Sequence, residues 1–124
     1  MKRAITIKVG KLKVRAGLND SKTGDEIYNK LPIESRVNTW GEEIYFDISV
    51  MADLEDTYAK EIVELGDLGY WPQGPAFCIF FGQTPVSKPG QIRSATAVNV
   101  IGKVSSDLEA FKKIKDGETI TLSK

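Results

Sequence analysis

The chain begins with strict alternation of apolar and polar side chains. Apolar residues occupy every second position across residues 4–9, and the alternation resumes after Gly10 across residues 11–18. Period-two patterning on both sides of a glycine is typical of a β-hairpin with one face in solvent. Residues 119–122 alternate in the same way after an Asp-Gly turn signal, which predicts a last strand.

The densest apolar run lies within residues 66–85, which read GDLGYWPQGPAFCIFFGQTP. Residues 76–81 are continuously apolar, as in a strand that is covered on both faces or forms the wall of a closed barrel. The Tyr70-Trp71 step before a short glycine-containing turn predicts the partner strand. We expect this central hairpin to organise the rest of the chain.

Residues 35–48 predict a second hairpin with a definite register. If Gly41-Glu42 is its two-residue loop, Trp40 lies opposite Glu43. The mostly apolar set of cross-strand pairs is expected to face the core. The other set leaves polar and aromatic side chains together on the outer face, which is a candidate site: Arg36, Asn38, Trp40, Tyr45 and Asp47.

Two short helices are predicted from capping boxes, in which a Ser or Thr precedes a Glu by three residues. The first begins at Thr23 and stops before Pro32, and the second begins at Ser106. Residues 61–65 and 98–104 are predicted strands, separated by a long exposed loop at residues 83–94. Strands dominate, so the predicted fold is mainly β: a small closed barrel capped by two short helices, forming one domain over residues 1–124.

Charge and composition restrict the partners. Lys plus Arg and Asp plus Glu number 17 each, and this balance argues against nucleic acid and anionic membranes as partners. No apolar run approaches membrane-spanning length. The start, Met1-Lys2-Arg3, leads directly into a strand without the apolar region of a signal peptide. A single cysteine allows no internal disulfide, which favours a cytoplasmic location.

The absence of histidine restricts the chemistry further. It excludes Ser-His and Cys-His nucleophile pairs, histidine general bases and the commonest transition-metal ligand. The acidic residues Asp53, Glu55 and Asp56 lack the spacing and the glycine of a calcium loop. No motif indicates a metal or a cofactor, so we expect neither. Any chemistry must use carboxylates, Lys, Arg, Tyr, the lone Cys, or binding alone.

Three segments resemble the cyclophilin-like domain proteins of prokaryotes: residues 66–85, WGEEIYF at residues 40–46 and VNVIGKV at residues 98–104. The resemblance extends from the first hairpin to Leu122. Residues 100–114 also look like the end of true cyclophilins, where a Gly-Lys-Val strand precedes a short helix. The resemblance implies a small barrel related in fold to the prolyl isomerases, in a family without an agreed biochemical role.

True cyclophilins use a Phe-His-Arg strand and a Phe-Met-x-Gln segment, and neither is present here. The resemblance implies that their substrate groove lies over the strand pair matching residues 35–48. Arg36 is then a candidate donor to a twisted prolyl amide, since isomerisation needs no proton shuttle. Asn38 and Tyr45 would be its hydrogen-bonding neighbours and Trp40 an apolar wall. The alternative is that Arg36 forms only a surface ion pair with Asp47, which would contribute little to stability.

Other side chains near the central hairpin are further candidates. Tyr70, Trp71 and Phe81 could line a binding pocket or be core residues; the core is favoured for Phe81, and Trp71, which precedes Pro72, is the best candidate for partial exposure. Arg93 on the predicted loop could hold a carboxylate or phosphate, or could simply face water. Cys78 lies inside the apolar run, away from any base, and is predicted to be a buried small hydrophobe.

These observations favour a domain that binds a small molecule or an extended, proline-containing peptide in a surface groove. The predicted site comprises Arg36, Asn38, Trp40, Tyr45, Tyr70, Trp71 and Arg93. One alternative is a degenerate prolyl isomerase that uses Arg36 as its donor. Another is an interaction module that forms a homo-oligomer through an exposed strand edge.

Overall fold

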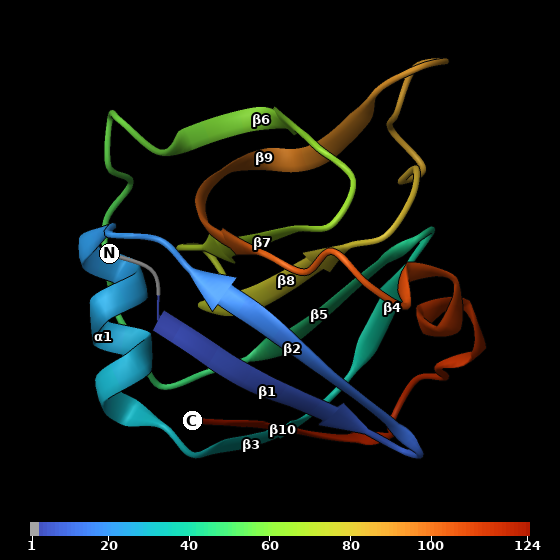
Figure 1. The fold of residues 1–124 in the computed structure, drawn as a ribbon. Helices are drawn as coiled ribbons and strands as arrows, with labels where there is room; N and C mark the ends of the chain where they lie inside the picture. The colour runs from blue at the N-terminus through green and yellow to red at the C-terminus, as the bar shows by residue number, and fades with distance from the viewer. Residues whose placement is uncertain (1–2) are drawn as a thin grey trace.

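A computed structural model describes residues 3–124 and shows a mainly β protein (Figure 1). Met1 and Lys2, at the start where no signal peptide is expected, lie outside the described residues. The elements in chain order are β1 Arg3–Val9, β2 Leu12–Leu18, α1 Lys22–Lys30, β3 Ile33–Arg36, β4 Asn38–Trp40, β5 Glu43–Asp47, β6 Ala59–Val63, β7 Asp67–Trp71, β8 Ala76–Phe80, β9 Ile92–Lys103, the 3₁₀ helix η1 Leu108–Lys113 and β10 Thr119–Ser123.

All ten described strands belong to one curled antiparallel sheet. Its hydrogen-bonded order is β3-β10-β1-β2-β9-β7-β8-β5-β4, and β6 pairs with β9 beside this path. The path is open because no ladder joins β3 to β4 among residues 3–124. The predicted closed barrel is therefore wrong, although the mainly β architecture is confirmed.

The two ends of the sheet are consecutive in the chain, separated only by Val37. The Val37 N–H donates to the Glu118 carbonyl at 3.0 Å, while the Val37 carbonyl accepts from the Gly117 N–H at 2.8 Å. The chain thus changes partner at Val37, from β10 to β5. As a result Arg36 lies opposite Thr119, and the predicted pairing of Arg36 with Asp47 is wrong.

The hairpin at residues 38–47 otherwise has the predicted register. Asn38 pairs with Tyr45, and Trp40 pairs with Glu43. The central hairpin is also confirmed, since Trp71 on β7 pairs with Ala76 on β8. Short loops, of two residues at 41–42 and four residues at 72–75, connect the paired strands, which explains why short-range patterning was sufficient here.

Strand β8 separates two apolar cores, so its uninterrupted apolar sequence has a simple explanation. Phe77 and Ile79 point into the main core, which is enclosed by the curled sheet and α1. Cys78 and Phe80 point to the opposite face, where they pack with Val98 in a smaller core. Figure 1 shows the ribbon formed by β6 and β9 passing over β7 and β8 on that side. The buried location predicted for Cys78 is confirmed.

Strand β9 runs further than the sequence predicted, because the expected loop ends before Ile92 rather than after Ser94. Its first part pairs with β6 alone, and its last part pairs with β7 and then β2. Gly102 allows the closest approach, since a Cβ there would lie 2.0 Å from the Gly17 carbonyl oxygen. This glycine therefore lets β2 and β9 pack together.

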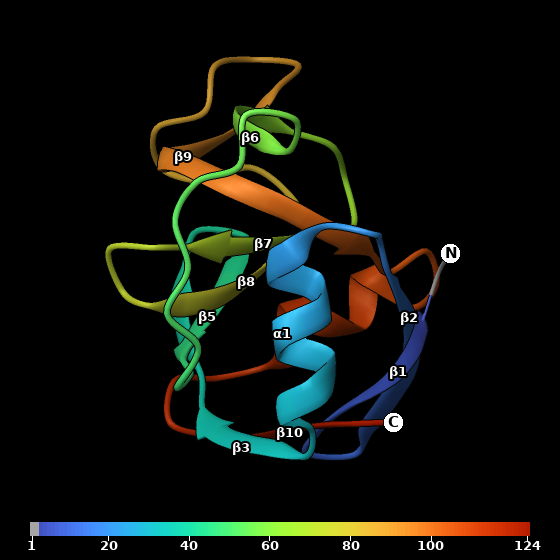
Figure 2. The same ribbon diagram turned by 90° about the vertical axis from the view of Figure 1, so that its left-hand side faces the viewer.

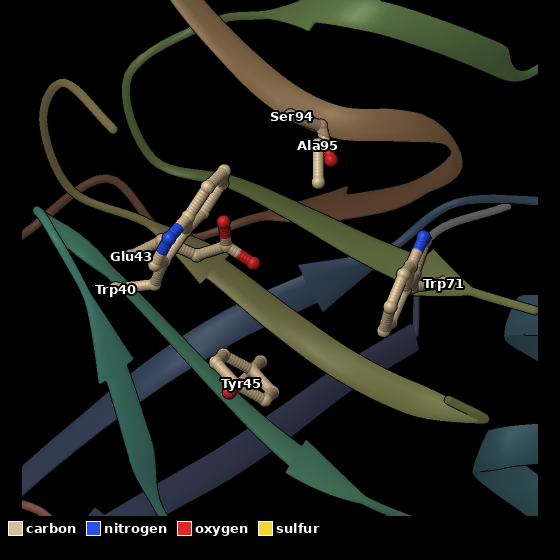
Figure 3. A pocket seen from close by; sticks show the side chains of 6 residues that line it. All are labelled: Trp40, Glu43, Tyr45, Trp71, Ser94 and Ala95. Atoms are coloured by element: carbon tan, nitrogen blue, oxygen red, sulfur yellow. The ribbon is translucent and has the colours of Figure 1, made fainter. Parts of the chain in front are cut away.

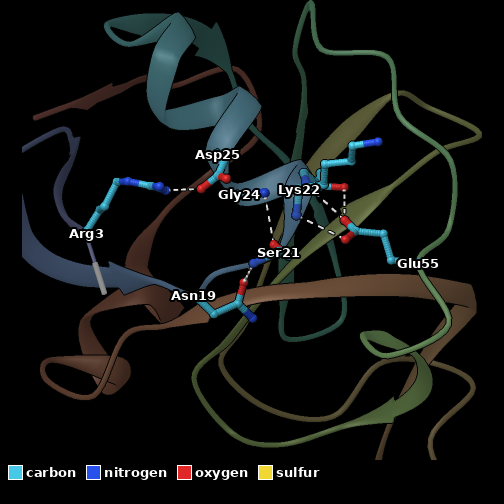
Figure 4. A network of polar contacts seen from close by, with 8 residues as sticks. Arg3, Asn19, Ser21, Lys22, Gly24, Asp25 and Glu55 are labelled. Carbon is cyan, nitrogen blue, oxygen red and sulfur yellow. Dashed lines mark hydrogen bonds and ion pairs between the residues drawn. The ribbon is translucent and has the colours of Figure 1, made fainter. Parts of the chain in front are cut away.

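Helix α1 lies across one side of the curled sheet (Figure 2). Its N-cap is Ser21, whose hydroxyl accepts from the Gly24 N–H at 3.0 Å, so the capping box predicted at Thr23 is wrong. Thr23 instead donates its hydroxyl to the Glu55 carboxylate at 2.6 Å. That carboxylate also accepts the Lys22 and Thr23 N–H groups, at 3.0 and 2.9 Å (Figure 4). A carboxylate from the loop after β5 thereby satisfies free amides at the helix N-terminus.

The second helical segment, η1, is a 3₁₀ helix without a side-chain cap. Its N-cap is Asp107, in the left-handed conformation with φ 58°, so the capping box predicted at Ser106 is also wrong. Phe111 is its buried anchor and stacks on Phe81 with ring centroids 5.8 Å apart.

Within residues 3–124, no helix is long and apolar enough to cross a membrane.

Candidate functional site

A cavity of about 160 Å³ lies between the outer face of the second hairpin and the ribbon of β6 and β9. Figure 3 shows Trp40 and Trp71 at opposite sides, Tyr45 along one edge and the Glu43 carboxyl reaching between them. The residues that line this space, which we call the aromatic cavity, are Trp40, Glu43, Tyr45, Trp71, Ser94 and Ala95. Both tryptophans of the chain are among them.

The cross-strand pairing in the hairpin determines one side of the cavity. Trp40 on β4 lies opposite Glu43 on β5, and Tyr45 follows two residues later on the same face. Tyr45 in turn pairs with Cys78 on β8, while Glu43 pairs with Phe80. Tyr45 thus packs against the smaller core.

Trp71 is held at the other side by a specific hydrogen bond. Its indole N–H donates to the Thr96 hydroxyl at 2.6 Å, and that hydroxyl donates to the Gln73 side-chain oxygen at 3.0 Å. Trp71 ends β7, immediately before the turn into β8. A hydrogen bond to the indole nitrogen limits rotation of the ring, so this wall is fixed by contacts from β9 and the turn.

An irregularity in β9 supplies the remaining wall. Lys60 pairs with Val98 but Ile62 pairs with Arg93, so residues 94–97 all lie opposite the single residue Glu61. The extra residues displace β9 from a regular ladder and bring Ser94 and Ala95 to the cavity. Strand irregularities of this kind are common beside functional sites, where they redirect side chains.

Glu43 is the most unusual residue of the cavity. Its side chain is buried, with 5% of the residue exposed. Burial raises the pKa of the Glu43 carboxyl to about 7, even though a hydrogen bond from the Cys78 thiol acts in the opposite direction. Proximity to Glu43, together with full burial, raises the pKa of Cys78 well above its usual value. Cys78 therefore stays a thiol and donates to Glu43.

Three of the predicted site residues contribute to the aromatic cavity: Trp40, Tyr45 and Trp71. Asn38 does not line it and donates to the Tyr45 carbonyl at 3.4 Å. Arg36 also lies elsewhere, because its guanidinium donates to the Gly117 carbonyl at 3.0 Å. The structure therefore separates Arg36 from the aromatic residues with which it was grouped.

The other two predicted residues are engaged by their own neighbours. Tyr70 is fully buried in the main core, where its hydroxyl donates to the Val50 carbonyl at 2.6 Å and accepts from the Ala52 N–H at 3.0 Å. Arg93 forms an ion pair with Glu61 at 3.3 Å. Neither side chain lines the aromatic cavity.

Sequence reasoning missed Glu43, Ser94 and Ala95 as lining residues. A signal for Glu43 was present, because the predicted register already placed it opposite Trp40 and on the face of Tyr45. The cavity that Glu43 lines is completed by β9, which is distant in the sequence and pairs irregularly. Ser94 ended the segment expected to be a loop, and Ala95 lay between that loop and the next predicted strand, so no local pattern indicated their position.

The fold and the cavity together define a β protein of the cyclophilin type with a partly open aromatic cavity. A family model described as cyclophilin-like matches residues 3–123, so the chain belongs to the cyclophilin-like family. The chain is also similar to the hypothetical protein AF2241 from Archaeoglobus fulgidus, solved in solution. The two share 38% identity over 98% of this chain and 94% of that protein, with a TM-score of 0.82.

A more distant structural neighbour is McbB, solved in complex with tryptophan. Identity is 15% and the TM-score is 0.71, over 97% of this chain and 44% of McbB. At this identity the likeness concerns the fold alone, and this chain spans less than half of McbB. A search of curated proteins finds no match.

Proposed function

We propose that this protein binds a small molecule that inserts one ring into the aromatic cavity. The observation that supports the proposal is an apolar space between two tryptophans that contains a buried carboxyl group. Sites for small molecules are typically concave and apolar, with few polar groups that fix orientation and with ionisable groups of shifted pKa. Glu43 and Ser94 are the polar side chains available here.

The size of the cavity favours a small ligand over an extended peptide. A volume of about 160 Å³ is close to that of an apolar protein cavity that accommodates benzene, roughly 150 Å³. It is below the range of roughly 300 Å³ and more that is typical for drug-sized ligands. The ligand, or the part of it that enters, is therefore about the size of one ring.

No observation favours the isomerase alternative over ligand binding. That alternative relied on Arg36 as a donor within the groove, and Arg36 donates to Gly117 away from the aromatic cavity. Isomerase activity and homo-oligomer formation remain predictions from the sequence.

The two tryptophans provide a direct test. A library of small aromatic and heteroaromatic compounds, including tryptophan because McbB was solved with it, is titrated against the protein while amide and indole N–H signals are followed by NMR. We expect a binding compound to shift the indole signals of Trp40 and Trp71 and the amide signals of Ser94 and Ala95. Signals of α1 should not move, because that helix does not line the cavity.

Trp71→Ala removes one wall and should weaken binding by at least about tenfold, since a stacked aromatic contact contributes roughly 1–3 kcal/mol by alanine substitution. Tyr28→Ala serves as the matched control, because Tyr28 is an aromatic residue on α1 away from the cavity. If no compound shifts the cavity signals, or if Trp71→Ala and Tyr28→Ala bind equally well, the proposal is wrong.

A further inference from the structure

The aromatic cavity contains one group that carries a charge near neutral pH. Among its described lining residues Glu43 is the sole carboxyl, and neither lysine nor arginine is present. The other groups are three aromatic side chains, one serine hydroxyl and one methyl group. An ionised Glu43 would thus be a buried negative charge without a cationic partner in the protein, an arrangement that is costly unless a ligand supplies the partner.

The aromatic rings fit the same kind of partner. Indole faces attract cations through the ring quadrupole, and tryptophan is the most effective residue for this interaction. Trp40 and Trp71 stand on either side of the Glu43 carboxyl, and Tyr45 lies along one edge (Figure 3). Proteins recognise quaternary ammonium groups with cages of aromatic rings, and here a carboxyl group lies between such rings.

We infer that the ligand of the aromatic cavity is an organic cation, a small amine or quaternary ammonium compound whose positive charge is neutralised by Glu43. The inference rests on the proposed function and specifies its ligand class. Neutral ligands would leave the carboxylate unpaired, and anions would be repelled by it.

Binding of such a cation is coupled to proton release from Glu43. The neighbouring elements supply no competing charge: β4 presents Trp40, β8 presents the Cys78 thiol and the apolar Phe80, and β9 presents Ser94. Cys78 is itself held in the neutral form. Arg93 on β9 is paired with Glu61 and does not line the cavity. The ligand therefore binds best where Glu43 is ionised.

Three probes that share a phenethyl group test the inference: phenethylammonium, 2-phenylethanol and 3-phenylpropanoate. Quenching or enhancement of the fluorescence of Trp40 and Trp71 reports binding of each probe. At about pH 8.5 we expect phenethylammonium to bind at least about tenfold more tightly than the alcohol, because hydrogen bonds to charged groups are stronger by roughly this factor. The propanoate should bind most weakly.

The pH dependence gives a second measurement. Below its pKa of about 7 Glu43 is increasingly protonated, so affinity for phenethylammonium should fall about thirtyfold from about pH 8.5 to about pH 5.5. The ammonium group itself stays charged over this range. Affinity for 2-phenylethanol should change by less than about twofold, because that probe carries no charge.

Glu43→Gln keeps the shape of the side chain and removes its charge, so it should abolish both the preference for the cation and the pH dependence. Asp47→Asn is the matched control, since Asp47 is an exposed carboxylate four residues further along β5 and outside the cavity. Equal affinity for the cation and the alcohol, or affinity that rises towards acid pH, would overturn the inference but leave the proposed function intact. Absence of binding by any ring compound would overturn both.

Discussion

Glu43 and Glu55 are the same residue type in opposite surroundings. Glu43 is buried against an apolar cavity with one weak donor, the Cys78 thiol, and its pKa is raised. Glu55 is partly exposed at the start of α1, where burial would raise its pKa but hydrogen bonds from Thr23 and Lys22, with the charge of Lys22, lower it. The number and strength of the donors therefore determine the sign of each shift.

The comparison also distinguishes a carboxylate that stabilises the fold from one that faces the aromatic cavity. Glu55 has three donors within the protein and fastens the loop after β5 to the helix. Glu43 has its thiol partner and a cavity in front of it. A carboxylate whose hydrogen-bonding capacity is filled by the protein stabilises the fold, whereas one that faces a cavity has capacity left for a ligand.

The largest expected effect comes from Glu43→Gln. A folded-state pKa of about 7 against an unfolded value near 4.5 means that the folded state holds its proton more tightly, so wild-type stability falls as pH rises from about 4.5 to about 7. Above about pH 7 the cost is about 3 kcal/mol. We expect Glu43→Gln to be more stable than wild type by about that amount at pH 8 and by little at pH 4.

Urea unfolding at the two pH values measures this difference. Asp47→Asn, on the exposed part of the same strand, should change stability by less than about 0.5 kcal/mol at either pH. A Glu43→Gln effect that is the same at both pH values would show that Glu43 is not protonated in the folded protein near neutrality.

Glu55→Gln should lower the stability of the protein, in contrast to Glu43→Gln, and by a smaller amount. The substitution weakens the hydrogen bonds from Lys22 and Thr23, so we expect a loss of about 1–2 kcal/mol at pH 7. Because the folded-state pKa of Glu55 is lowered, this stabilisation is present above the unfolded pKa and disappears as pH falls through the folded one. The difference in stability between Glu55→Gln and wild type should therefore disappear at acid pH.

The matched control for Glu55 is Glu61→Gln, which weakens the ion pair with Arg93 on the surface. Exposed pairs contribute little, so we expect less than about 0.5 kcal/mol. Thermal unfolding followed by circular dichroism compares the two variants with wild type, and equal losses would contradict the structural role assigned to Glu55.

Cys78→Ala tests the single donor to Glu43. Removing the thiol should raise the pKa of Glu43 further, because the hydrogen bond from Cys78 lowers it. Cys78→Ser, which keeps a donor, should raise it less or lower it. Carbon-13 NMR titration of the glutamate carboxyl groups measures the pKa of Glu43 in both variants. The pKa of Glu55 serves as the internal control and should not change. An unchanged Glu43 titration in Cys78→Ala would show that the thiol does not donate to it.

The smallest effect is expected for Arg36→Ala. The Arg36 guanidinium donates to the Gly117 carbonyl and does not line the cavity, so probe affinity should stay within about twofold of wild type. The same variant, assayed on Xaa-Pro peptides, tests the isomerase alternative. A large loss of binding or of isomerase activity would show that Arg36 takes part in the functional site.

The sequence was sufficient for features set by neighbouring residues. The register of Trp40 against Glu43 and the hairpin of β7 and β8 follow from turn residues and alternation, and both are confirmed. The family resemblance is confirmed as well. Three aromatic residues of the cavity could therefore be named in advance, because they belong to these two hairpins.

The features that sequence reasoning missed depend on contacts between distant segments. The change of partner at Val37 follows from pairing with β10, more than 80 residues later, as the Arg36 and Thr119 pair shows. Ser94 and Ala95 reach the cavity from the irregular part of β9, which no local pattern indicates. The N-caps of α1 and η1 are Ser21 and Asp107 rather than the predicted residues Thr23 and Ser106. The Thr23 hydroxyl instead donates a hydrogen bond to Glu55.

The pairing of β9 has a consequence for how the cavity admits a ligand. Ser94 and Ala95 lie where β9 pairs with β6 alone, whereas Glu43 and Tyr45 lie on a strand flanked on both sides. Two-stranded ribbons are the less stable part of a sheet and open more often than its interior. One wall of the cavity therefore belongs to a two-stranded ribbon and the opposite wall to the interior of the sheet, so we expect the first wall to open more often than the second.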